Sequence, residues 1–188
     1  RIQFHKEYFW QFLAVALSFY FLGQFSHKIQ AIANVASPIW PASGVAIGFL
    51  FIYSRRLFPA VFLGCVFLEM NTGLPLWSIL IIAIGNSLEC FVGATILREI
   101  VKRKESFFVK GEMSGIVISS FVGAIISALF GLTALYFSGV ITSHQIEITF
   151  MTWFLGDFVG ILICVPIFVE AQRQSLFLLQ IKKDLLEN

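Results

Sequence analysis

The stretch WFLGDFVGILICVP, from Trp153 to Pro166, decides the fold class of this chain. It is as apolar as a membrane-crossing segment, yet Asp157 lies near its middle. A charge deep in hydrocarbon costs several kcal/mol unless it faces protein or water, so Asp157 is a candidate functional residue. Gly156 and Gly160 are four residues apart and provide an edge of small residues on which another helix can pack closely.

The composition of the whole chain supports a membrane protein. Of its 188 residues, 58% are hydrophobic and only 13% are charged, and the mean hydropathy is +0.87, outside the usual balance of a soluble domain. The formal net charge of +2 is too small to indicate a nucleic-acid partner. All 3 Cys fall in apolar segments without a CxxC spacing, which is typical of small buried side chains and not of a disulfide or zinc site.

Six apolar segments are candidates for membrane spans, which need about 20 residues to cross the roughly 30 Å hydrocarbon core. They run from about Phe9 to Phe25, Ser37 to Tyr53, Leu57 to Leu68, Leu76 to Leu97, Ser114 to Phe137 and Ile148 to Val169. The sequence therefore predicts an all-α integral membrane protein, a bundle of about six transmembrane helices with broken or short helices at spans two and three.

The positive charges predict the orientation of these spans, because Lys and Arg beside a span are retained on the cytoplasmic side. Of the 13 Lys and Arg residues, all but Lys28 precede span one, follow span six, or lie between spans two and three or spans four and five. These four places share one side if every span crosses the membrane. We therefore expect a multi-pass protein of the bacterial inner membrane with both termini in the cytoplasm.

The residues after Val169 form a tail of mixed polar and apolar character. A short heptad seam runs through it, made of Ala171, Gln174, Leu178, Ile181 and Leu185. This pattern fits a helix lying on the membrane surface or the start of a signalling helix that pairs with its copy. We divide the chain into a transmembrane bundle, residues 1–170, and the start of a cytoplasmic helix, residues 171–188. Because the chain begins with Arg1, we expect it to be part of a longer protein.

Three polar residues lie deep in the predicted spans. Asn86 and Glu89 are three residues apart in span four and share a helix face, while Asp157 is in span six. We expect a polar contact between these spans near the middle of the membrane, with one carboxyl protonated, because burial and a neighbouring like charge both disfavour a second negative charge. The contact is either a hydrogen-bonded clasp between helices or a site for a ligand or a proton.

A second set of residues falls near the outer ends of the spans. Its members are Trp40, Glu69, Asn71, Trp77 and Trp153. They could line an outward-facing pocket, since short and proline-broken spans often line cavities. They could equally be hydrated end residues and interfacial tryptophans. His27 and His144 also fall on this side, but two His without a supporting carboxylate or Cys are too few to predict a metal site.

Small residues predict close contacts between helices. The segment PIWPASGVAIG, Pro38 to Gly48, combines two prolines that disfavour regular helix with two glycines four apart. The predicted packing residues are Gly44, Gly48, Gly85, Gly156 and Gly160. Gly123, Ser127 and Gly131 make a comparable face on span five.

Three segments in this order resemble a known family. They are PIWPASGVAIGFLFIYSRRLFPAVFLG, IGNSLECFVGATILRE and WFLGDFVGILICVPIF. Together they are similar to the first type of membrane-associated sensor domain, the MASE family, found at the N-terminus of bacterial histidine kinases and diguanylate cyclases. The resemblance covers about Trp10 to Glu170. The positions that match the family pattern are Trp40, Pro41, Gly44, Gly85, Asn86, Glu89, Trp153, Gly156 and Asp157.

The resemblance implies a sensory role, with ligands mostly undefined across the family. We expect the input domain of a two-component histidine kinase or of a cyclic di-GMP synthase, which passes binding of a small ligand or a membrane protein to a cytoplasmic output domain. One alternative is a small proton-linked transporter, suggested by Glu69, Glu89 and Asp157, and another is a docking subunit for a sensing transporter.

The segment itself is not expected to be an enzyme. It has no Gly-rich phosphate loop, HExxH pair or nucleophilic Ser motif, so we predict no catalytic residue, no metal and no cofactor. The expected partners are a second copy of the chain in a homodimer, an unknown ligand or membrane protein, and the lipid bilayer.

Overall fold

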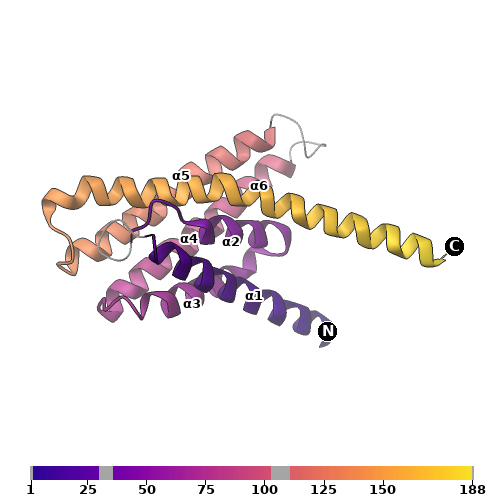
Figure 1. Ribbon diagram of the computed structural model, residues 1–188, viewed down its shortest axis with the longest axis horizontal. Helices are drawn as coiled ribbons and strands as arrows, with labels where there is room; N and C mark the ends of the chain where they lie inside the picture. Colours follow the sequence, from indigo (N-terminus) through magenta and orange to yellow (C-terminus); the bar gives the residue numbers. More distant parts are fainter. Residues whose placement is uncertain (1, 30–35, 103–110, 188) are drawn as a thin grey trace.

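The computed structural model describes residues 2–29, 36–102 and 111–187. The α-helices in these ranges are α1 Ile2–His27, α2 Pro41–Ile52, α3 Phe58–Glu69, α4 Leu76–Lys102, α5 Gly111–Phe137 and α6 Ile146–Glu187. Two 3-10 turns, η1 Arg55–Leu57 and η2 Ser143–Gln145, precede α3 and α6. Each of the six predicted segments therefore coincides with a helix (Figure 1).

Four of the helices, α1, α4, α5 and α6, are long and apolar enough to cross a membrane. Helices α2 and α3 have 12 residues each, which is about 18 Å at 1.5 Å per residue, well short of the roughly 30 Å of hydrocarbon. The all-α membrane class is thus observed in the described residues, with four candidate spans. A bundle of six crossings stays a prediction.

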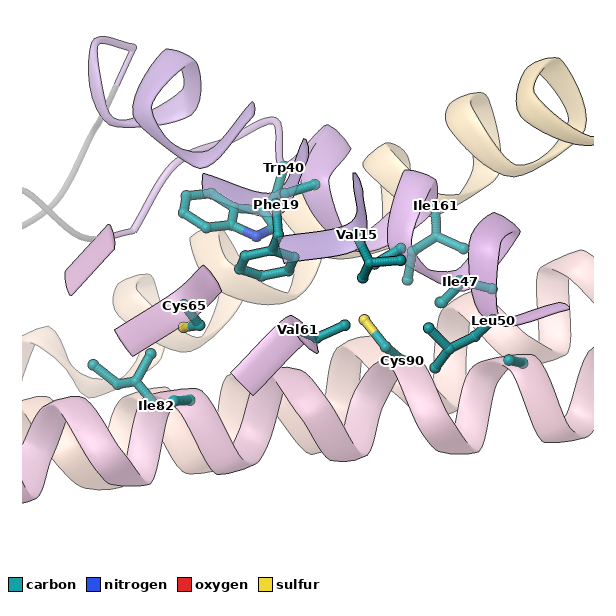
Figure 2. Close-up of a cluster of buried hydrophobic side chains, with 14 of the residues drawn as sticks. Val15, Phe19, Trp40, Ile47, Leu50, Val61, Cys65, Ile82, Cys90 and Ile161 are labelled. Atoms are coloured by element: carbon teal, nitrogen blue, oxygen red, sulfur yellow. The ribbon is translucent and has the colours of Figure 1, made fainter. Parts of the chain in front are cut away.

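Helix α2 lies at the centre of the bundle, packed against α1, α4 and α6. It begins at Pro41, whose missing N–H costs nothing at the first helical position. Its buried residues are Ala42, Ser43, Gly44, Ala46, Ile47, Gly48 and Leu50. Side chains from α1, α2, α3, α4 and α6 meet in the surrounding core, which Figure 2 shows with Ile47 and Leu50 beside Cys90 and Ile161.

The other helices surround α2 and also pack against one another. Helix α5 packs against both α4 and α6, and α3 packs against α1 and α4. The turns that follow α3 and α5 contain Gly73 and Gly139, whose φ angles of 79° and 75° suit a residue without a side chain.

Helix α6 is the longest, with 42 residues and Pro166 inside it. It runs along the long axis of the molecule, and its C-terminal part extends beyond the other helices, toward the end where the N-terminus also lies (Figure 1). The seam residues Leu178, Ile181 and Leu185 lie on this extension, but their side chains are outside the described part of the structure. The choice between a surface helix and a pairing helix therefore stays open.

Candidate functional site

Three buried polar side chains from three helices meet at the centre of the bundle. Ser43 of α2, Glu89 of α4 and Asp157 of α6 are at most 1% exposed. The Ser43 hydroxyl donates to Glu89 Oε2 at 2.7 Å and lies 3.2 Å from Asp157 Oδ1. A serine of the central helix therefore joins the two carboxyls that span four and span six contribute.

The chemistry of this cluster follows from the single proton of a serine hydroxyl. Ser43 can donate to one carboxylate only, so it bonds to both groups when the second carboxyl is protonated and donates to the Ser43 oxygen. With both carboxyls ionised, one contact becomes a repulsion between an oxygen lone pair and a charged oxygen. The cluster is therefore suited to hold one proton between Glu89 and Asp157.

Helix α5 closes the cluster on another side. Trp153 Nε1 donates to Ser127 Oγ at 3.0 Å, and both side chains are buried. The Trp153 ring fits against Gly131, where a Cβ would lie 2.5 Å from ring carbons, and Gly123 lies beside the Glu89 side chain. The small-residue face predicted on span five thus holds the tryptophan and the glutamate of its neighbours.

A pocket of about 10 Å³ adjoins the cluster, and its described lining is Ala36, Ser37, Trp40, Trp153 and Asp157. This volume has room for a group of about the size of one water molecule. Asp157 Oδ2 and Trp40 Nε1 are buried and have no hydrogen-bond partner among the described residues. The pocket is therefore lined by a carboxyl group of which one oxygen has no hydrogen-bond partner among the described residues.

The segment before α2 is fastened to α6 by backbone contacts. Trp40 N donates to Gly156 O at 3.0 Å. A Cβ at Gly156 would collide with the Ser37 carbonyl oxygen, and one at Gly160 would collide with the Trp40 carbonyl oxygen. These two glycines therefore let α6 approach the backbone of residues 37–40, which carries one wall of the pocket.

A second polar contact lies behind Trp40. Glu69, which ends α3 and is 1% exposed, forms an ion pair with His27 at 3.4 Å when the imidazole is protonated. The His27 ring lies 5.4 Å from the Trp40 ring, and Phe19 packs edge-on against the same indole at 6.5 Å. Trp40 thus connects this ion pair to the pocket.

The structure brings together only part of the predicted outer pocket. Trp40 and Trp153 line the observed pocket. Glu69 contacts His27, whose ring lies beside Trp40. Asn71 and Trp77 are exposed and are not among its described lining residues. Asn71 lies in the turn after α3 and Trp77 at the exposed start of α4. A role for these two residues in ligand binding stays a prediction.

The predicted contact between spans four and six also differs in detail. Asn86 is buried, but its amide donates to Ile82 O of its own helix at 3.0 Å, and its Oδ1 has no partner among the described residues. Glu89 and Asp157 are joined through Ser43, which lies in the segment predicted above for helix packing. A hydroxyl among small apolar residues, such as Ser43 in PASGVAIG, often forms hydrogen bonds between membrane helices. This feature of the sequence could have predicted the contact.

Arg98 has a role that the charge count alone missed. Its Nε donates to Phe51 O at 2.9 Å, and its Nη2 donates to Leu50 O and Phe51 O at 2.9 and 2.7 Å. The last carbonyls of a helix have no partner within the helix and carry partial negative charge. Arg98 of α4 therefore fixes the C-terminal end of α2. Near the N-terminal end of α2, Ser43 contacts Glu89 of the same neighbouring helix.

The fold and the site define an all-α membrane domain with a buried polar centre and no group of three or more potential metal-ligating side chains in its described residues. Residues 11–172 match the MASE1 family model, so the chain belongs to the MASE1 family of membrane sensor domains, which occur in signalling proteins and are not catalytic. The comparisons with curated proteins and with solved structures each give no match.

Proposed function

We propose that this domain is the sensory input of a bacterial histidine kinase or diguanylate cyclase. The observation that carries the proposal is the course of α6. One helix holds Trp153 and Asp157 in the buried centre and continues to Glu187, beyond the rest of the bundle (Figure 1). A change at the centre can therefore reach an output domain through one continuous helix.

Transmission requires two arrangements of the bundle that a stimulus stabilises unequally. The cluster supplies them, because the proton can lie on either Glu89 or Asp157, and each choice changes how Ser43 holds α4 and α6 to α2. Pro166 follows the cluster on α6 and lacks the N–H that would bond to the carbonyl of Leu162. We propose that α6 bends most readily there.

The same proposal includes the position of the domain in the cell. The Lys and Arg distribution supports the inner membrane with both termini in the cytoplasm. The common direction in which the two ends of the chain extend agrees with this topology (Figure 1). A homodimer, paired through the tail after Val169, would bring two output domains together.

Helix-phase insertions test the proposal. Two residues inserted after Glu170 rotate the following helix by about 200°, whereas seven residues change its phase by only about 20°. In the longer protein, assayed in isolated membranes, we expect the two-residue insertion to change kinase or cyclase activity and the seven-residue insertion to leave it near the wild-type value. Equal activity in all three proteins would contradict signalling through α6 and would favour the transporter alternative.

A further inference from the structure

The pocket beside the polar centre combines two aromatic walls with a carboxyl group. Trp40 and Trp153 supply the indoles, Asp157 supplies the carboxyl, and all three side chains are at least nine-tenths buried. Indole faces attract cations within about 6 Å of the ring, and the attraction grows when water is excluded. The lining is therefore suited to a small positively charged group.

The charge balance of the centre leads to the same conclusion. Within the described residues, neither Glu89 nor Asp157 forms an ion pair, whereas the comparably buried Glu69 has His27 at 3.4 Å. Ser43 lies at Asp157 Oδ1, while Oδ2 has no hydrogen-bond partner among the described side chains. Asp157 is one of the residues that line the pocket. A buried carboxylate is costly unless it is paired and hydrogen-bonded, so a cation that donates hydrogen bonds would complete this one.

We propose that the pocket binds an ammonium group, either the ammonium ion or the head of a primary amine. Its N–H groups donate to Asp157 Oδ2, and its charge lies beside the indoles of Trp40 and Trp153. The space of about 10 Å³ fits a group of this size and excludes a quaternary ammonium. The inference rests on the proposed sensory role and identifies the chemical class of its stimulus.

Binding would act directly on the cluster. An ammonium charge at Oδ2 stabilises ionised Asp157, so the shared proton moves toward Glu89. Ser43 then donates to Asp157 and accepts from Glu89, the reverse of the arrangement with the proton on Asp157. The ligand thereby changes the bonds that hold α6 to α2, which is the step the proposed function requires.

Tryptophan fluorescence provides the test, using the purified chain in lipid nanodiscs. A Trp10→Phe, Trp77→Phe background leaves Trp40 and Trp153 as the two reporters among the 4 Trp of the chain. Ammonium chloride and methylammonium chloride are titrated at fixed pH and ionic strength. Potassium chloride serves as the control cation, because it has a similar size and no N–H donor.

We expect ammonium chloride to give a saturable change that potassium chloride does not give. Asp157→Asn should raise the ammonium concentration at half-saturation by about tenfold or more, because a charge-assisted hydrogen bond is lost. Glu147→Gln, an exposed carboxyl at the start of α6, should leave it unchanged. Trp40→Phe should weaken binding by a few-fold through its smaller aromatic face, and it covers the case in which Asp157→Asn does not fold.

The outcomes separate this inference from the proposed function. Saturation by ammonium alone identifies the ion, and saturation by methylammonium as well identifies primary amines. Equal responses to potassium, or unchanged binding in Asp157→Asn and Trp40→Phe, would overturn the site. Phase-dependent output without ammonium binding would refute this inference only, whereas ammonium binding with phase-independent output would refute the signalling function only.

Discussion

Helices α2 and α3 have equal lengths of 12 residues and are both apolar, yet they occupy different places in the molecule. Helix α2 packs against α1, α4 and α6 and has no exposed residue, whereas α3 packs against α1 and α4 and exposes Phe58, Leu63 and Phe67. Hydrophobicity alone therefore does not decide which helix is central.

Small side chains distinguish the two helices. In α2 they are Ala42, Ser43, Gly44, Ala46 and Gly48, and they face several neighbours. Within a membrane, helices gain little from burying apolar surface, so packing and hydrogen bonds between helices decide their association. A helix with small residues on every side can accept neighbours all round, and α2 is such a helix.

The largest expected effect comes from closing a backbone contact around α2. In Gly160→Ala the new Cβ collides with the Trp40 carbonyl oxygen, which cannot move without displacing the start of α2. We expect a loss of about 1 to 3 kcal/mol in stability, as for other overpacked sites. Thermal unfolding in mild detergent, followed by size-exclusion chromatography, measures the loss.

The matched control for this substitution is Gly23→Ala, where α1 packs against α3. The atoms nearest to its Cβ all belong to the Leu68 side chain, which adjusts more readily than a backbone carbonyl, and Ala is about 1 kcal/mol more favourable than Gly within a helix. The loss of stability should therefore be clearly smaller than in Gly160→Ala. Equal losses in both variants would contradict the special role of the contact between α2 and α6.

A smaller effect is expected from the hydroxyl at the centre. Ser43→Ala removes the bridge between Glu89 and Asp157, which should cost about 0.6 to 1 kcal/mol, the range expected for hydrogen bonds in membranes and proteins. Ser120→Ala removes an equally buried hydroxyl that bonds only to Ile116 O of its own helix, and it should cost less. The same unfolding assay compares them, and a larger loss in Ser120→Ala would argue against the bridge.

Much of the fold could be predicted from the sequence, because each helix contains a mainly apolar segment that is separated from the next by Pro, Gly or charged residues. Helix α2 begins at Pro41 and ends before Arg55, and α3 lies between Arg55 and Asn71. The close spacing of these three residues explains why both helices are short. The central position of α2 could not be read from one helix at a time, since it depends on which neighbours approach its small residues.

The candidate site was predictable in its charged members and not in its connections. Glu89 and Asp157 stand out because acidic residues are costly within a span. Ser43, Ser127 and His27 do not, since a serine hydroxyl can bond within its own helix and a histidine beside a loop can be hydrated. Their partners depend on how helices far apart in sequence are rotated, which periodicity does not specify.

The most direct measurement of the central claim is the output activity of the longer protein carrying changes at Asp157. Asp157→Asn keeps the shape but cannot ionise, and Asp157→Leu also removes the hydrogen bond to Ser43. With membrane insertion verified by protein levels in isolated membranes, both variants should have kinase or cyclase activity fixed at a high or low value, while Asn71→Leu at an exposed position should resemble the wild type. Wild-type activity and response in both Asp157 variants would contradict the account, because the buried cluster would then have no part in signalling.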